Sequence, residues 1–153
     1  MDLAKVIRPD AVKLPLEAYD KEEAIAELVE VLVRSGRIGD REGVLQALYD
    51  REAKGSTGIG GGVAIPHAKR DGVEGVLLAV GVSPDGIEFD AADGELVRLV
   101  FLVVAETDNP GPNVEVLADI GYLMQVPGIY RRLIAAPDAA ALIGVVRSVR
   151  EEN

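Results

Sequence analysis

Residues Val97–Ala105 read VRLVFLVVA, a run of nine residues in which Arg98 is the only polar side chain. A second run, Val76–Val82, reads VLLAVGV and is apolar throughout. Short continuous apolar runs of this kind are typical of strands that are buried on both faces of a sheet. They are also too short to cross a bilayer of about 30 Å as helices. The two runs therefore predict the centre of a buried β-sheet.

Helical patterns precede these runs. Asp20 with Glu23 predicts a capping box, and Gly36 is placed to end the helix that follows. The apolar residues of that helix recur at the helical period: Ile25, Leu28, Val29 and Leu32. A second helix is expected to begin after Asp40 and to run into Arg51-Glu52. Before both, Val12–Leu16 is predicted to be a short edge strand, because Pro15 interrupts it.

Helical patterns also follow the apolar runs. One helix is expected after Asn109–Pro112, a short one at Ile129–Ala136, and a last one capped by Asp138. Between the two strands, Ser83–Gly86 and Ala92–Gly94 have the composition of turns. Helices on both sides of a central strand block indicate one α/β domain over residues 1–153, with a mixed sheet.

The composition excludes several classes of function. The chain has 153 residues, with 16 basic against 26 acidic side chains, a net charge of −10 and no cysteine. Such a charge disfavours nucleic acids and anionic membranes as partners, since binding to phosphates needs a surplus of Lys and Arg. A single histidine without cysteine also disfavours a metal site, and we expect no cofactor. The first residues lack a signal-peptide pattern, so we expect a cytoplasmic protein without membrane insertion.

The single histidine, His67, is the strongest candidate for chemistry. It follows Pro66 at the end of a short apolar strand and lies downstream of a glycine-rich loop. Imidazole has a lone pair at neutral pH and can form a labile bond to phosphorus, although most lone histidines have no chemical role. The surrounding segment favours a role, because backbone N–H groups, hydroxyls and a guanidinium could together hold an anion. The residues that supply these groups are Arg51, Ser56, Thr57, Gly58, Gly60, Gly61 and Gly62.

Two nucleotide-binding motifs can be set aside. The segment Gly58–Val63 lacks the last glycine of the dinucleotide fingerprint and leads into an apolar run that ends at Pro66. Lys54–Thr57 contains the residue types of a P-loop end in the wrong order. The glycines therefore do not indicate a nucleotide site.

Three short segments together resemble the active-site signature of enzyme IIA domains of the bacterial phosphotransferase system. They are Arg51-Glu52, Ser56–Gly60 and Val63–His67. The resemblance is to the fructose/mannitol class, most of all to the free-standing nitrogen-regulatory IIA proteins. It implies a three-layer α/β/α sandwich around a mixed sheet.

The resemblance also implies a phosphoryl carrier. The histidine that matches His67 accepts a phosphoryl group from the carrier protein HPr or a paralogue. It then passes the group to a sugar-specific IIB domain, or signals its phosphorylation state to a regulatory target. The arginine that matches Arg51 stabilises the phosphoryl charge. This division of labour suits phosphoryl transfer, which depends on positioning and charge stabilisation.

One position departs from the family pattern. The family usually has a second histidine where this chain has Asn113. Asparagine can cap a helix, or it can keep a neutral contact in the active site. Two alternatives to a carrier therefore stay open: a binding module of the same fold with weakened or lost phosphotransfer, and a sensor of a small anion in the glycine-lined cleft.

Overall fold

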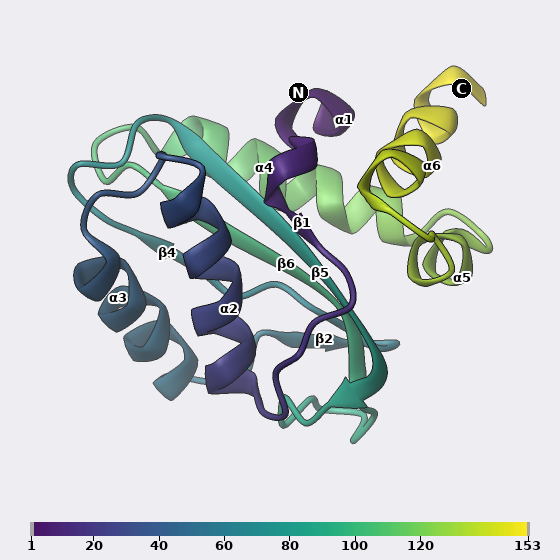
Figure 1. The fold of residues 1–153 in the computed structure, drawn as a ribbon, viewed down its shortest axis with the longest axis horizontal. Coiled ribbons are helices and arrows are strands. Elements are labelled where there is room, and N and C mark those ends of the chain that lie inside the picture. Colours follow the sequence, from purple (N-terminus) through teal and green to yellow (C-terminus); the bar gives the residue numbers. More distant parts are fainter. Residues whose placement is uncertain (1, 153) are drawn as a thin grey trace.

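A six-stranded mixed sheet separates two layers of helices in the computed structural model, which describes the backbone of residues 2–152 and the side chains of residues 2–149 (Figure 1). Helices α2 (Lys21–Arg34) and α3 (Arg41–Ala53) cover one face. The other face is covered by α1 (Leu3–Val6), α4 (Pro110–Met124), α5 (Ile129–Ile134) and α6 (Ala139–Glu152). The three-layer sandwich is confirmed.

The two apolar runs form the central strands, β5 (Val76–Ile87) and β6 (Val97–Ala105), which pair antiparallel. Along β6, Leu99, Phe101 and Val103 pack into the core under α4–α6, whereas Val100, Leu102 and Val104 pack under α2 and α3. This alternation is the two-residue period of a strand with both faces buried. The prediction of buried strands is confirmed.

Four short strands complete the sheet. β1 (Val12–Lys13) is the edge strand beside β5 and runs parallel to it, as the interrupting Pro15 predicted. β3 (Val63–Ala64) and β4 (His67–Lys69) both pair parallel with β6, and β2 (Gly58–Gly60) pairs antiparallel with β3. A short 3₁₀ helix, η1 (Pro9–Ala11), precedes β1. No helix within residues 2–152 is both long and apolar enough to span a bilayer.

The predicted helix ends are largely those of the structure. Asp20 accepts a hydrogen bond from the N–H of Glu23 at 2.8 Å, and Asp138 accepts one from Ala141 at 2.8 Å. The carboxylate of Glu23 accepts from the N–H of Tyr19 at 3.2 Å, one residue before the position that a capping box uses. Gly36 lies just beyond α2 with φ of +79°, a conformation that glycine adopts without strain.

The prediction of a turn at Ser83–Gly86 is wrong. Strand β5 continues to Ile87, which is buried and pairs with Val97. The register shifts between Val82 and Ile87, and Gly86 within this irregularity has φ of +84°. The Pro-Asp-Gly sequence therefore accommodates a bulge inside a strand. The turn at Ala92-Asp93 is confirmed, and the N–H of Gly94 donates to the carbonyl of Ala91 at 2.9 Å.

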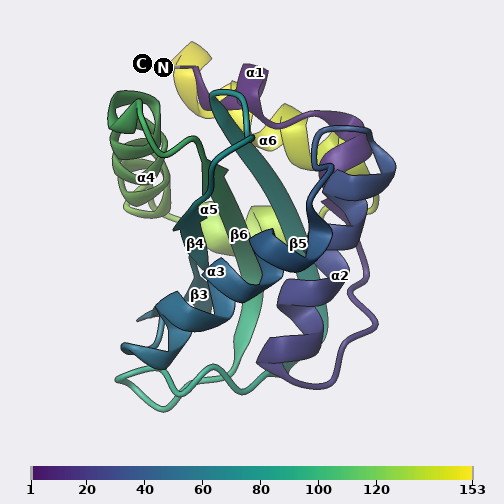
Figure 2. The same ribbon diagram turned by 90° about the vertical axis from the view of Figure 1, so that its left-hand side faces the viewer.

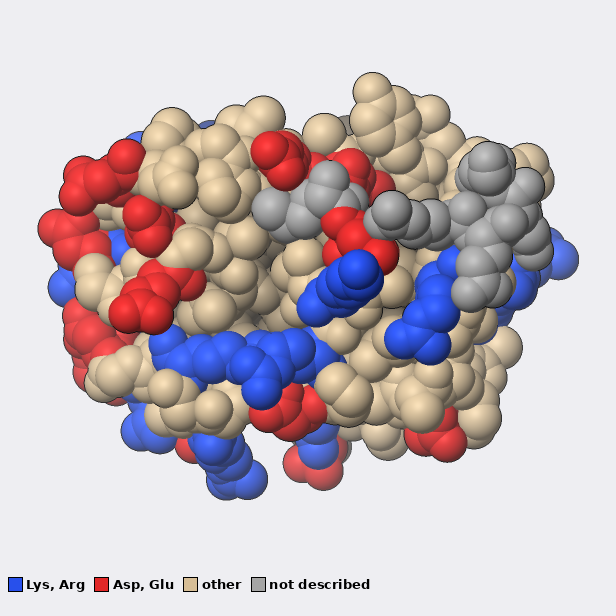
Figure 3. All heavy atoms as spheres, turned by 90° about the horizontal axis from the view of Figure 1, so that it is seen from above, with Lys and Arg blue, Asp and Glu red and all other residues tan. Residues whose placement is uncertain are grey.

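Charge is unevenly distributed over the surface. In the view of Figure 3, acidic side chains gather at the left end of the face and basic side chains form a band across its lower half. A net charge of −10 is therefore compatible with local groups of cations.

Candidate functional site

A cavity of about 280 Å³ lies at the edge of the sheet where β4 meets α3 and the start of α4. Figure 2 looks onto this edge, with β3 and β4 between the two helices. The cavity brings His67 together with two other residues singled out from the sequence, Arg51 and Asn113. The remaining lining residues are Ala47, Asp50, Lys54, Ala68 and Lys69.

His67 is held in one orientation by the backbone of its own segment. It is the first residue of β4, not a residue beyond the end of a strand, and it pairs in register with Val103 of β6. Its ring Nδ1 lies 2.7 Å from the carbonyl oxygen of Ile65. Because a carbonyl oxygen can only accept, this hydrogen bond places the proton on Nδ1 and leaves the lone pair on Nε2. Nε2 therefore carries the free lone pair of a partly exposed imidazole.

Arg51 lies in the last turn of α3 and borders the same cavity. Its Nη1 donates to the carbonyl of Gly55 at 2.9 Å, which fixes the guanidinium against the end of the helix. A guanidinium has five N–H donors, so this bond leaves others for an anion.

Asn113 is not a helix cap. Helix α4 begins at Pro110 with Asn109 in the capping position, so Asn113 is the fourth residue of the helix. The capping interpretation is therefore wrong, because the helix starts earlier than the sequence pattern suggested. Asn113 is 7% exposed and lines the cavity with His67. Its Oδ1 is buried and has no hydrogen-bond partner among the described residues.

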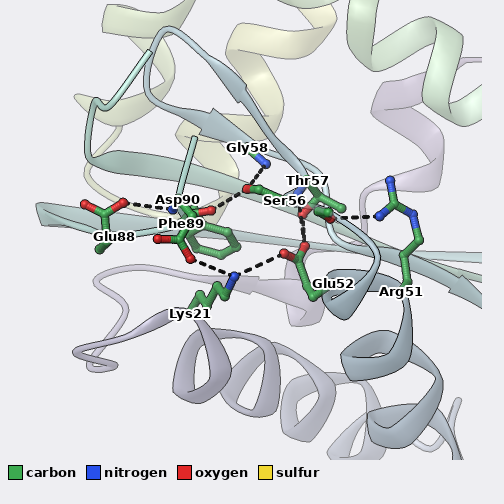
Figure 4. A network of polar contacts seen from close by, with 10 residues as sticks. Lys21, Arg51, Glu52, Ser56, Thr57, Gly58, Glu88, Phe89 and Asp90 are labelled. Atoms are coloured by element: carbon green, nitrogen blue, oxygen red, sulfur yellow. Dashed lines mark hydrogen bonds and ion pairs between the residues drawn. The ribbon is translucent and has the colours of Figure 1, made fainter. Parts of the chain in front are cut away.

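Ser56 and Thr57 use their hydroxyls within the protein. The Ser56 hydroxyl donates to the carbonyl of Phe89, and the Thr57 hydroxyl donates to the carboxylate of Glu52 (Figure 4). Glu52 is buried and lies 3.7 Å from the Nζ of Lys21. These contacts tie the loop after α3 to the helix and to the segment after β5. Neither Ser56 nor Thr57 lines the cavity around His67.

The glycine loop lies elsewhere along the sheet. Gly58 donates its N–H to the Ser56 hydroxyl at 3.0 Å, and Gly61 donates its N–H to the Asp93 carboxylate at 2.9 Å. Gly61 and Gly62 border a separate cavity of about 320 Å³. Val63 pairs with Leu99 and His67 pairs with Val103, so the glycines lie toward the opposite end of β6.

Four residues of extended chain span about 13 Å. The structure thus brings none of Gly58, Gly60, Gly61 and Gly62 into the cavity around His67, contrary to the expectation of a glycine cradle there.

Three charged residues of the cavity were missed from the sequence: Asp50, Lys54 and Lys69. Spacing could have found two of them. Lys69 follows His67 by two residues in a strand, and Lys54 follows Arg51 by three residues at the end of a helix, so each pair shares a face. The Oδ1 of Asp50 accepts a hydrogen bond from Gln46 at 2.8 Å.

Comparison with known families gives one match along most of the chain. Residues 5–149 match the family described as "Phosphoenolpyruvate-dependent sugar phosphotransferase system, EIIA 2". Among curated relatives, the chain is 34% identical over 146 residues to the fructose-specific EIIABC component of Bacillus subtilis. That match covers 95% of this chain and 23% of the relative. The nitrogen regulatory protein of Bradyrhizobium diazoefficiens is 31% identical over 146 residues, with 95% of each chain covered.

Solved structures of the same fold agree. The nitrogen regulatory protein IIA-Ntr of Neisseria meningitidis superimposes with a TM-score of 0.86 at 27% identity, covering 94% of this chain and 98% of that one. The Escherichia coli complex of enzyme IIAMtl with phosphorylated enzyme IIBMtl gives a TM-score of 0.79 at 22% identity, covering 93% and 99%. The second likeness is evidence for the fold alone.

Proposed function

The chain belongs to the EIIA 2 family of phosphoenolpyruvate-dependent sugar phosphotransferase systems, and from this membership we propose that it carries a phosphoryl group on Nε2 of His67. Proteins of this family are phosphotransferase components. The observation that carries the proposal is the hydrogen bond between Nδ1 of His67 and the carbonyl of Ile65, in a cavity shared with Arg51. It presents a nucleophilic nitrogen beside a permanent cation.

We propose a transfer step that is consistent with this geometry. The lone pair of Nε2 attacks the phosphorus of a phosphohistidine on the donor, and a new N–P bond forms as the N–P bond of the donor breaks. The donor ring, protonated on its other nitrogen, leaves as neutral imidazole. The ring of His67 then carries positive charge with its proton still on Nδ1, where the carbonyl of Ile65 accepts a stronger hydrogen bond than before.

Arg51 is the group that stabilises the incoming charge. The oxygens of a phosphoryl group carry roughly two negative charges at neutral pH, of which the positive ring of His67 offsets one. On a protein with a net charge of −10, such an addition needs a nearby cation.

We infer two classes of protein partner. The donor is an HPr-like phosphocarrier, as the family resemblance of the active-site segments implies. The acceptor is a IIB domain, or the phosphorylated chain signals to a regulatory target. The regulatory relatives of Bradyrhizobium and Neisseria support signalling to a regulatory target, and the EIIABC relative of Bacillus subtilis supports a IIB acceptor.

A second candidate function is a binding module that has lost phosphotransfer. Asn113 favours it, because this neutral side chain occupies the cavity where the family usually has a second histidine. Such a module would keep the fold and the cavity without covalent chemistry at His67.

One experiment separates the two functions. The chain is incubated with phosphoenolpyruvate, enzyme I and HPr, and its intact mass is measured with and without acid treatment. A carrier gains one acid-labile phosphoryl group, and His67→Ala gains none. A wild-type chain that gains no mass while HPr becomes phosphorylated would favour the binding module.

A further inference from the structure

We propose that Lys69 is a second phosphoryl-binding cation of the His67 site. The inference rests on the proposed function, since it concerns the phosphoryl group on His67. Lys69 lies outside the three active-site segments, and it is a cation additional to the expected Arg51.

The strand places Lys69 on the same side as His67. Both residues belong to β4, and their partners on β6 are Val103 and Ala105. Side chains two residues apart in a strand point to the same face, with a separation of about 6.6 Å along the chain. Both line the same cavity. The four-carbon stem of a lysine is long enough for its ammonium to reach a group bound to the neighbouring imidazole.

Lys69 has no structural partner that would account for its position. None of the hydrogen bonds and ion pairs among residues 2–149 uses its ammonium, and its side chain is exposed. Lys54, the other lysine of the cavity, is the C-terminal capping residue of α3. A cation there is favoured by the partial negative charge of the helix end. Lys54 thus has a structural role that Lys69 lacks.

The charges of the cavity match the added group. The lining side chains include three cations, Arg51, Lys54 and Lys69, and one carboxylate, Asp50. Arg51 already donates to Gly55, and Asn113 is neutral. A phosphoryl group has three acceptor oxygens and roughly two negative charges, so it can bind a second cation besides the guanidinium. The ammonium of Lys69 supplies the additional charge from the strand that carries the nucleophile.

The test measures phosphoryl uptake from phosphoramidate, a small donor that needs no carrier protein. Intact mass gives the rate for the wild type, Lys69→Gln and Lys69→Arg. We expect Lys69→Gln to slow uptake about tenfold, which corresponds to about 1.4 kcal/mol in the barrier. Lys69→Arg keeps the charge and should stay within about threefold of the wild type. Raising the salt from about 0.05 M to about 0.5 M should slow the wild type more than Lys69→Gln, because salt screens the attraction that the variant lacks.

Lys13→Gln is the matched control for net charge. Lys13 lies on β1, which β5 and β6 separate from β4 in the sheet. Three strand spacings amount to about 14 Å, beyond the screening length of about 8 Å at physiological salt. We expect Lys13→Gln to react at the wild-type rate.

Three outcomes would contradict the proposal. If the wild type reacts and Lys69→Gln matches it in rate and salt dependence, Lys69 has no role and the carrier function stands. If Lys69→Arg is as slow as Lys69→Gln, the charge is not the cause. If the wild type gains no phosphoryl group from phosphoramidate or from phosphorylated HPr, both this inference and the carrier function fail.

Discussion

Thr57 donates two hydrogen bonds to a single carboxylate oxygen of Glu52, one from its backbone N–H at 3.2 Å and one from its hydroxyl. Glu52 is the residue after Arg51, and both lie in the last turn of α3. The pair therefore fastens the loop after α3 to the helix turn that presents Arg51 to the cavity (Figure 4).

Replacing Thr57 by valine should destabilise the fold. The change removes the hydroxyl at nearly constant volume and leaves the buried Glu52 carboxylate with one hydrogen bond fewer. We expect a loss of about 1–3 kcal/mol in the free energy of unfolding, measured with urea. Thr57→Ser, which keeps the hydroxyl, is the control and should lose less. Equal losses in the two variants would show that packing, and not the hydrogen bond, accounts for the effect.

Acid should weaken the contact between α3 and the end of β4. Asp40 caps α3 through Gly43 and accepts from Arg70, which follows β4, at 2.9 Å. The bond from Arg70, and then the N–H of Gly43, lower the pKa of Asp40 below its ordinary value of 3.8. The carboxylate of Asp40 therefore takes up a proton less readily in the folded state than in the unfolded state. The contribution of the ionised Asp40 to stability is present above pH 3.8 and is lost as the pH falls through the folded pKa.

The substitution Asp40→Asn tests this pH dependence. Urea midpoints at several pH values between about 2 and 7 should fall less steeply with acid in Asp40→Asn than in the wild type. Asp85→Asn, at an exposed carboxylate within β5, controls for net charge. If stability depends on pH in the same way in all three proteins, Asp40 does not contribute to the acid dependence.

Local patterns in the sequence predicted most of the fold. The continuous apolar run Val97–Ala105 predicted a strand buried on both faces, and Asp20 and Gly36 marked the ends of α2. The prediction failed at Ser83–Gly86, where turn-forming residues lie inside a strand. Turn chemistry is local, whereas this segment is held by pairing between Ile87 and the distant Val97. The strand pairing therefore outweighs the local turn propensity of Ser83–Gly86.

The candidate site was predicted less completely than the fold. The active-site segments singled out His67 and Arg51, which the structure brings into one cavity. The glycines were placed beside them because they are near in sequence, but an extended chain carries neighbours apart at about 3.3 Å per residue. Asn113 was ambiguous because the start of α4 could not be fixed from two prolines, Pro110 and Pro112. Lys69 could have been predicted, because it follows His67 by two residues in a strand and such residues share a face.

Arg51→Gln should slow phosphoryl uptake about tenfold or more, a barrier increase of about 1.4 kcal/mol. The amide keeps part of the length of the side chain but loses the charge that the guanidinium brings to the cavity around His67. Arg51→Lys should restore part of the rate, because an ammonium carries the charge without the planar fork of donors. Rates are measured by intact mass at a fixed concentration of phosphorylated HPr. A wild-type rate in Arg51→Gln would make the bond to Gly55 the main role of this arginine.

Asn113→His should add a second ionisation to the pH profile of phosphoryl uptake. Asn113 faces the cavity and is not the cap of α4, so an imidazole there would lie beside the incoming phosphoryl group. The wild type has a single histidine, so its pH profile should show one ionisation fewer than the profile of the variant, once that of HPr is subtracted. The variant should react faster below the pKa of the new histidine, which titrates in the range of about pH 5–8.

Asn113→Asp is the opposite test at nearly the same size. It places a carboxylate in the cavity, and the repulsion of the incoming phosphoryl group should slow uptake about tenfold or more, again about 1.4 kcal/mol in the barrier. Stability provides a separate check on Asn113→His. The buried Oδ1 of Asn113 accepts no hydrogen bond among the described residues, so replacing it breaks none. We therefore do not expect the loss of about 0.5–2 kcal/mol in the free energy of unfolding that removal of a helix cap causes. Uptake rates that respond to neither charge would mean that residue 113 does not contact the phosphoryl group, and the missing second histidine would then have no bearing on transfer.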